Sequence, residues 1–263
     1  MNLRSPFRAL GTAFRTLTVI RVPGREAESL AYSFPFFPVV GLVLGGGVAL
    51  IGWALGGRWQ AWPAGAAALA VAWMAWITGG LHLDGLADTV DGLSGGRTRE
   101  RALEIMKDSR IGAMGAIAIA LILIVKTVAI ARLIELDAWR WLPVPVILSR
   151  LAQVQMAVSL PYARAEGGTA ERFVKDVRPI AYVLAAIVAL VCCLLLAGVS
   201  GAAAWLGASL IAMRFGYRMR RRLGGVTGDV LGYASEITET TLFVAIAMGL
   251  SFWNEMLWHL HQL

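Results

Sequence analysis

The sequence contains two cysteines, Cys192 and Cys193, which are adjacent within an apolar run. They belong to no Cx₂C pair and have no neighbouring histidine, so they give no sign of a metal site or of a disulfide framework. We expect them to face lipid or to pack inside the protein. They carry no information about the redox compartment.

Charged residues are also scarce, at 16% of the chain, whereas hydrophobic residues make up 58% and the mean hydropathy is +0.67. Soluble domains are roughly 45–50% apolar, so this composition excludes an ordinary soluble protein. The sequence therefore predicts an integral membrane protein with the lipid bilayer as a partner.

The chain has no continuous basic stripe, although its net charge is +7 and its pI is near 10. Its Lys and Arg residues are divided among short loops between apolar spans, which argues against nucleic acid as a partner. We interpret them as topology signals and as ligands for phosphate.

We expect residues 1–34 not to be a secretory signal peptide, because they contain five arginines and neither an uninterrupted apolar core nor a small-residue cleavage site. Large apolar residues instead recur at helical spacing with arginines between them, which predicts a short helix in the membrane interface. They are Phe7, Leu10, Phe14 and Leu17. We expect Pro23 and Gly24 to end this helix.

No internal repeat, low-complexity tract or interdomain linker divides the chain, so we expect a single domain over residues 1–263. About seven apolar stretches approach the roughly 20 residues that a membrane crossing needs. They lie near 35–56, 61–80, 112–131, 141–160, 180–198, 201–217 and 240–258. Only Gly198 to Gly201 separate the fifth from the sixth, which predicts a tight hairpin. The predicted fold class is an all-α, polytopic membrane helical bundle.

Positive charge alternates between the two ends of this bundle. The N-terminal segment and the loops near 81–111, 161–179 and 214–240 hold 5, 5, 4 and 5 Lys and Arg residues, whereas the other loops and the C-terminus hold Arg58, Arg132 and Arg140. By the positive-inside rule, the N-terminus and the long loops are cytoplasmic and the C-terminus lies outside.

Three aspartates, Asp84, Asp88 and Asp91, stand at i, i+4 and i+7, on one face of any helix they occupy. They would repel one another unless a cation lay between them. Mg²⁺ is usually held by one or two carboxylates together with substrate phosphates. With Lys107 and Arg110 downstream, this Asp row indicates a site for a metal and a phosphate.

A solvated acidic helix face is the alternative interpretation of the Asp row. The glycines around it argue against that alternative, because each costs about 1 kcal/mol in a helix interior relative to alanine. They are Gly79, Gly80, Gly85, Gly92, Gly95 and Gly96. Close approach of a ligand or of another helix would require them.

Three motifs in the same order resemble the bacterial cobalamin synthase family, the adenosylcobinamide-GDP ribazoletransferases. They read GGLHLDGLADTVDGL, EIMKDSRIG and GGVTGDVLGYASE, and the likeness extends to FFPVVGLVLG, to Ser149-Arg150 and to PYARAEGG, so it covers nearly the whole chain. One departure is Tyr233, which stands where a small residue is expected.

The resemblance implies a Mg²⁺-dependent phosphoryl transfer at the cytoplasmic face of the bacterial inner membrane. A ribose hydroxyl of α-ribazole, or of its 5′-phosphate, attacks the phosphate that esterifies the cobinamide arm of adenosylcobinamide-GDP, GMP leaves, and adenosylcobalamin or its 5′-phosphate forms. The implied metal ligands are Asp84, Asp88 and Asp91, and Asp88 or His82 receives the hydroxyl proton. The implied substrate ligands are Lys107, Asp108, Arg110, Arg150, Thr227, Asp229 and Glu236. A homo-oligomer is left open.

Several of these residues have simpler interpretations. His82 could cap a helix or pack at the membrane boundary. Thr227 could be a helix N-cap, with Asp229 near the positive end of the helix dipole. We expect Arg150, inside a span, to have a phosphate or carboxylate partner within the bundle. Lys126, with no polar residue near it in its span, is expected to snorkel.

Two other functions remain as alternatives. Gly80, Asp84 and Asp88 match GxxxDxxxD, the second half of the signature of CDP-alcohol phosphotransferases. The first half, DGxxAR, is absent because Asp88 stands where its Arg would be. A transporter would need ionisable groups near the bilayer midplane, where only Lys126 and Arg150 are expected and no acidic residue is.

Overall fold

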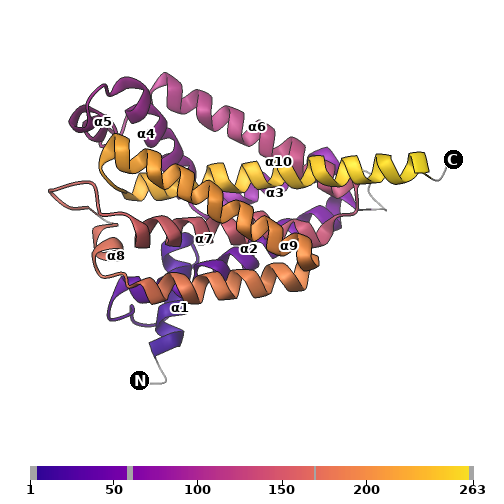
Figure 1. Ribbon diagram of the computed structural model, residues 1–263, viewed down its shortest axis with the longest axis horizontal. Helices are drawn as coiled ribbons and strands as arrows, with labels where there is room; N and C mark the ends of the chain where they lie inside the picture. Colours follow the sequence, from indigo (N-terminus) through magenta and orange to yellow (C-terminus); the bar gives the residue numbers. More distant parts are fainter. Residues whose placement is uncertain (1–4, 58–61, 169, 261–263) are drawn as a thin grey trace.

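The computed structural model describes residues 5–57, 62–168 and 170–260, and within these ranges every regular element is a helix. Figure 1 shows the long helices lying side by side in one bundle. The elements are α1 (Ser5–Leu17), η1 (Leu30–Phe36), α2 (Phe37–Gly56), α3 (Pro63–Ile77), α4 (Leu81–Gly95), α5 (Arg99–Ile105), α6 (Ala113–Glu135), η2 (Trp139–Trp141), α7 (Pro143–Ser159), α8 (Glu171–Lys175), α9 (Pro179–Leu223) and α10 (Gly228–Leu260).

The described residues form five helices that are long and apolar enough to cross a membrane, or up to six if α3 and α4 count as one broken span. The five are Leu30–Gly56, Ala113–Glu135, Trp139–Ser159, Pro179–Leu223 and Gly228–Phe252. The chain is therefore a multi-pass membrane protein. The seven predicted stretches fall on these helices and on α3, and two of them share α9.

α9 consists of two helical arms, and the direction of the chain reverses between them at Gly198. This residue has φ 58° and ψ −143°, a conformation that only glycine adopts without strain. A Cβ at Gly201 would overlap the carbonyl oxygen of Cys193, so the two arms meet backbone to backbone at the turn. Figure 1 shows the arms folding back on each other, which confirms the predicted hairpin. Cys193 is fully buried there, as a packing residue.

α7 is the centre of the bundle. It packs against α2, α9 and α10, and nearly all of its residues are buried. A helix that is buried on all sides needs no polar face, and α7 is apolar except for a few residues that include Arg150 and Gln153. These polar side chains therefore lie inside the protein, where each requires a partner.

α4 leaves the direction of the bundle. It bends by 86° from α3, at a turn where Gly79 and Gly80 have φ values of 60° and 69°. These left-handed conformations suit glycine and explain why two stand together. We therefore treat α4 as a segment at the end of the bundle and not as a span. Figure 1 places α1, α4, α5 and α8 at one end of the molecule and the C-terminus at the other.

α1 forms as the apolar spacing predicts, but it ends earlier than expected. It ends at Leu17, not at Pro23 and Gly24, because the amide of Val19 donates to the carbonyl of Ile77 (2.8 Å) and draws the chain toward the end of α3. Its Ala13 and Leu17 are buried, and the helix packs on η1. α1 thus forms part of the protein wall at this end of the bundle.

A cluster of four charges lies buried between α6, α7 and α10. Lys126 donates to Glu236 (2.7 Å) and to Glu239 (2.8 Å), and Arg150 donates to Glu239 (3.2 Å) and to Ser235 (2.7 Å). The expectation that Lys126 snorkels is wrong, because its partners come from a distant helix. The expected carboxylate partner of Arg150 is present.

The acidic members of this cluster also correct the predicted seventh span. α10 begins at Gly228 and not near residue 240, so Glu236 and Glu239 lie within a membrane-crossing helix. The expectation that no acidic residue stands among the spans is therefore wrong. The two acids pair with Lys126 and Arg150, and this pairing offsets part of the cost of burying four charges.

Candidate active site

The Asp row and the C-terminal motif meet where α4 crosses the start of α10. A Cβ added to Gly85 would lie 2.6 Å from the carbonyl oxygen of Asp229, and one added to Gly232 would lie 3.2 Å from the Cα of His82. Only glycine lets the two backbones approach so closely. The close approach predicted from the glycines is therefore an approach between helices, and it joins two motifs that lie more than a hundred residues apart.

A cleft with a volume of about 510 Å³ opens at this crossing. Asp84 and His82 line it from the first turn of α4, and Asp229 lines it from the first turn of α10. Gln153 of α7, residues of α1 and η1, and Phe173 of α8 complete the walls. Because both helices begin at the cleft, the positive ends of two helix dipoles face it, an arrangement that favours anions.

The carboxylates at the crossing influence one another. Burial raises the pKa of Asp88 to about 7, and the charges of Asp84 and Asp229 add to the rise, whereas the Arg164 guanidinium opposes it. The Asp row is thus part of a larger acidic group that includes Asp229. A cation would relieve the repulsion within this group.

A divalent cation fits this donor set, but the protein alone does not enclose one. Within the described ranges, no three His, Cys, Asp or Glu side chains converge closely enough to hold a metal ion. Mg²⁺ typically takes one or two protein carboxylates, with water and substrate phosphates as its other ligands. Asp84 and Asp229, which share the cleft, and Asp88, which interacts with both, are suited to that mode of binding.

Asp91 has a different environment from the rest of the Asp row. Its Oδ2 accepts from the amide of Gly112 (2.7 Å) and its Oδ1 from the amide of Gly115 (2.8 Å). These amides belong to the start of α6, so Asp91 caps that helix from outside. A Cβ at Gly112 would come within 2.5 Å of this carboxylate, which explains the glycine. Its predicted role as a metal ligand remains untested.

The motif with Lys107, Asp108 and Arg110 lies beside the cleft and not in it. Lys107 pairs with Glu166, and Arg110 donates to Asp108 through Nε (3.0 Å) and Nη2 (2.6 Å). The Arg110 pairing lowers the pKa of Asp108 to about 2. None of the three residues lines the cleft, so their predicted roles as phosphate ligands remain untested and would require a movement of this loop.

The start of α10 combines a cap with an ion pair. Thr227 Oγ1 accepts from the amide of Val230 (3.3 Å), so the N-cap interpretation of Thr227 is confirmed. The same hydroxyl donates to Asp229 Oδ2 (3.2 Å), which also accepts from Arg164 Nη2 (2.8 Å). Asp229 is therefore held by two donors at the edge of the cleft.

The remaining predicted ligands lie deeper in the protein. Glu236 is turned toward Lys126 and Arg150 toward Glu239, and neither lines the cleft. His82 does line it, but its side chain is 2% exposed and neither ring nitrogen has a hydrogen-bond partner in the described part of the chain. His82 is thus available to a ligand, whereas Glu236 and Arg150 already have protein partners.

The sequence analysis did not assign Arg164 and Gln153 to the site. Arg164 links Asp229 to the carbonyl of Met106 (3.3 Å), which ties three segments together. In the sequence, Arg164 could have been found as a basic residue within the motif PYARAEGG, which is predicted to lie on the same side of the membrane as the Asp row. The signal for Gln153 was a polar side chain in an apolar span, one turn from Arg150.

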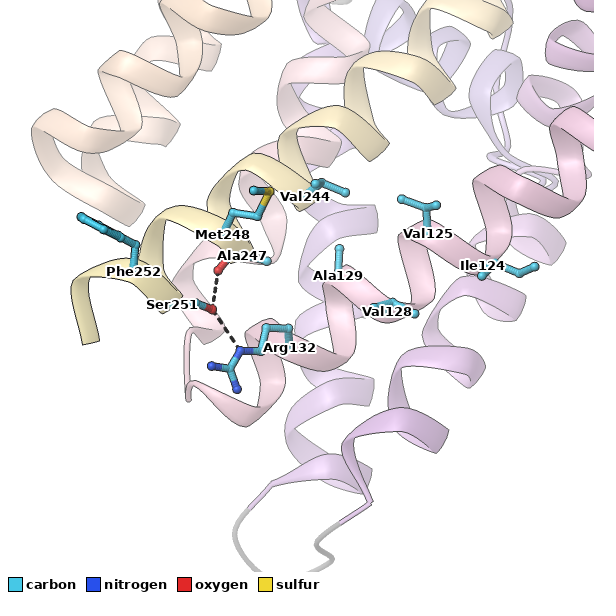
Figure 2. A pocket seen from close by; sticks show the side chains of 10 residues that line it. All are labelled: Ile124, Val125, Val128, Ala129, Arg132, Val244, Ala247, Met248, Ser251 and Phe252. Atoms are coloured by element: carbon cyan, nitrogen blue, oxygen red, sulfur yellow. Dashed lines mark hydrogen bonds between the residues drawn. The ribbon is translucent and has the colours of Figure 1, made fainter. Parts of the chain in front are cut away.

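Another hollow, of about 570 Å³, lies between α6 and α10. Figure 2 shows its apolar lining, which includes Val128 and Met248, with one polar edge where Arg132 donates to Ser251 (3.0 Å). It contains no carboxylate and opens between spans toward the position of the lipid. It therefore offers no carboxylate to a metal, and its one cation, Arg132, is already paired with Glu135 (3.1 Å).

Comparisons with known proteins show which family the chain resembles over most of its length. The model of the cobalamin-5-phosphate synthase family matches residues 9–247. An adenosylcobinamide-GDP ribazoletransferase of Chlorobaculum tepidum is 43% identical over 249 residues, covering 93% of this chain and 97% of that protein. Proteins of the same name from Chlorobaculum parvum (44% identity, 92% and 95% covered) and Roseiflexus sp. (39%, 94% and 92%) are also similar. No solved structure matches the chain.

Proposed function

The chain belongs to the cobalamin-5-phosphate synthase family and is a ribazoletransferase of cobalamin nucleotide-loop assembly, and from this premise we propose that its reaction takes place in the cleft between α4 and α10. The observation that carries the proposal is the meeting of Asp84 and Asp229 in one cleft at the N-termini of two helices. Pyrophosphate needs neutralisation, and both helix ends supply positive potential.

The reaction transfers the phosphate on the cobinamide arm of adenosylcobinamide-GDP. A ribose hydroxyl oxygen of α-ribazole, or of its 5′-phosphate, forms a bond to this phosphorus, the bond to the bridging oxygen breaks, and GMP leaves with that oxygen. Asp88 receives the hydroxyl proton, since its raised pKa of about 7 makes it a stronger base than an ordinary carboxylate. His82 is the second candidate for this role.

Asp84 and Asp229 would hold Mg²⁺ in the cleft, and Asp88 lies close enough to interact with both carboxylates. When bound there, Mg²⁺ supplies charge neutralisation for the phosphates. Arg164 orients Asp229 through its 2.8 Å contact and adds positive charge at the edge of the cleft. We further propose that the cleft opens to the cytoplasm, because the segments around it carry most of the Lys and Arg residues.

The test is a turnover assay of the purified protein in detergent. With adenosylcobinamide-GDP, α-ribazole and Mg²⁺, we expect GMP and a cobalamin product in equal amounts, and removal of Mg²⁺ with EDTA should abolish both. Restoring activity with excess Mg²⁺ is the control for irreversible damage. GMP release that persists without a divalent ion would refute the metal assignment.

A further inference from the structure

We propose that the inner part of the cleft is a pocket for the flat aromatic base of α-ribazole, and that Gln153 binds the free ring nitrogen of this base. We define this base pocket by Phe34, Phe37, Phe173, His82 and Gln153, all of which line the cleft. The inference rests on the proposed function, since it assigns one of the two substrates to a place in the same cleft.

Three aromatic rings form one wall of the base pocket. The ring centroids of Phe34 and Phe37 are 4.9 Å apart, and those of Phe34 and Phe173 are 5.8 Å apart, with edge-to-face or tilted planes. The rings come from η1, α2 and α8, so three separate elements contribute to the wall. Such a wall suits a flat aromatic ligand, because stacking and edge contacts add to simple apolar burial.

The lining of the base pocket also carries polar atoms that no group in the described residues satisfies. Gln153 is 3% exposed and its Oε1 has no hydrogen-bond partner among the described residues, and both ring nitrogens of His82 are in the same state. Buried polar groups are almost always hydrogen-bonded, so these atoms indicate a ligand that supplies the partners. An amide oxygen can only accept, but a half-turn of the terminal amide of Gln153 puts its NH₂ group at this buried position, where it donates to an acceptor atom of the ligand.

Among the parts of the two substrates, the ribazole base matches this pocket best. A benzimidazole attached to ribose has one acceptor nitrogen, no donor and an otherwise apolar surface. Guanine carries more donors and acceptors along its edge than Gln153 and His82 can satisfy, and those left over would lie against the aromatic wall at a high cost. The corrin ring is too large for a cleft of about 510 Å³. A base in this pocket leaves its ribose near Asp84 and Asp229.

The first experiment separates the effects on the two substrates. Gln153→Leu keeps the shape of the side chain but removes the donor, and we expect the KM for α-ribazole to rise about tenfold while the KM for adenosylcobinamide-GDP and kcat change little. The matched control is Gln155→Leu, on the same helix. Gln155 donates to the carbonyl of Ser209 (3.0 Å) outside the cleft, so its loss should leave the KM for α-ribazole unchanged.

The second experiment measures binding without turnover, by equilibrium dialysis of the nucleoside against the protein in detergent, without Mg²⁺ or the second substrate. The matching indole α-riboside has a C–H in place of the acceptor nitrogen. We expect the wild type to bind it about tenfold more weakly than α-ribazole, and Gln153→Leu to bind both equally. Phe173→Leu, which removes only aromatic character, should weaken both ligands by the same factor.

These outcomes distinguish the two proposals. Saturable, Gln153-dependent binding of α-ribazole in a protein that releases no GMP would support the base pocket and refute the reaction. Normal GMP release would refute the base pocket if Gln153→Leu kept both its KM and its discrimination between the two bases. A fall in kcat or in the thermal midpoint with an unchanged KM would assign Gln153 a merely structural role and would also overturn the inference.

Discussion

Asp84 and Asp91 lie on the same face of the same helix, but they face different surroundings. Asp84 is exposed to the cleft, whereas both oxygens of Asp91 accept backbone amides at the start of α6. A carboxylate in this capping position satisfies amides that the helix itself leaves without partners. The spacing that places both residues on one face could not reveal this difference, because it depends on a segment more than twenty residues away.

We therefore expect substitutions of Asp84 and Asp91 to have different effects on activity and on stability. Asp84→Asn should lower kcat/KM more than a hundredfold with little change in the thermal midpoint, because it removes a metal or phosphate contact and no protein contact. Asp91→Asn should lower the midpoint, because its NH₂ group would face an amide donor of α6, at a cost of about 2 kcal/mol. The measurements are kinetics and differential scanning fluorimetry in detergent. Equal losses of activity in the two variants, at unchanged thermal midpoints, would contradict this expectation and would support Asp91 as a metal ligand.

The sequence predicted only in part how the charges buried among the spans are paired. The unfavourable position of Arg150 inside a span predicted a partner, and Glu239 is that partner. Lys126 gave no such indication, because its own span is otherwise apolar and its partner Glu236 lies 110 residues later. Predictions that use the local sequence recognise a costly group more readily than the distant group that stabilises it.

At the scale of elements, α4 and α10 approach each other because the crossing point contains no side chain on α4. The gap at Gly85 is too small for a methyl group, since the nearest atom, the carbonyl oxygen of Asp229, would lie 2.6 Å from a Cβ. The atoms in the way are backbone, which cannot move aside without shifting a helix. Gly85, together with Gly232 on α10, thus sets how closely the two helices cross.

Gly85→Ala should displace α4 from α10 and so reduce both the thermal midpoint and turnover, with a loss of activity of at least tenfold from the misplaced Asp84. Gly249→Ala is the control, because a Cβ at Gly249 on α10 has no atom within 4 Å. That substitution should leave activity unchanged and should stabilise the protein by about 1 kcal/mol, because alanine has a higher helix propensity than glycine. A fully active Gly85→Ala protein would show that the crossing does not position the site.

The helices were predicted with more success than their ends. Hydropathy is a local property, so each predicted apolar stretch falls on a helix. The short segment from Gly198 to Gly201 between two such stretches predicted the reversal of α9. The start of α10 was placed twelve residues too late, at 240 and not at Gly228, because Glu236 and Glu239 resemble loop residues. Only the opposite charges on α6 and α7 make them compatible with a span.

At the scale of the whole molecule, the charged loops and the proposed catalytic cleft share one end. Figure 1 places α1, α4, α5 and α8 together, and the C-terminus of α10 at the far end of the bundle. The sequence predicted this grouping by counting Lys and Arg alone, because every hairpin returns the chain to the same side. The details of the cleft were not predictable in this way, since they depend on which side chains meet across α1, α4, α7 and α10.

The orientation of this arrangement in the membrane makes the last prediction. Alkaline phosphatase is active only outside the cytoplasm, so a fusion at the C-terminus should be active and a fusion at Gly167, in the loop before α8, should be inactive. Green fluorescent protein at the same positions should give the opposite pattern and controls for poor expression. The physical reason is the excess of Lys and Arg on the segments around the cleft, which are retained on the cytoplasmic side during insertion. An active fusion at Gly167 would place the cleft outside the cell, away from any cytosolic supply of nucleotide-activated substrate, and would refute the proposed site together with the orientation.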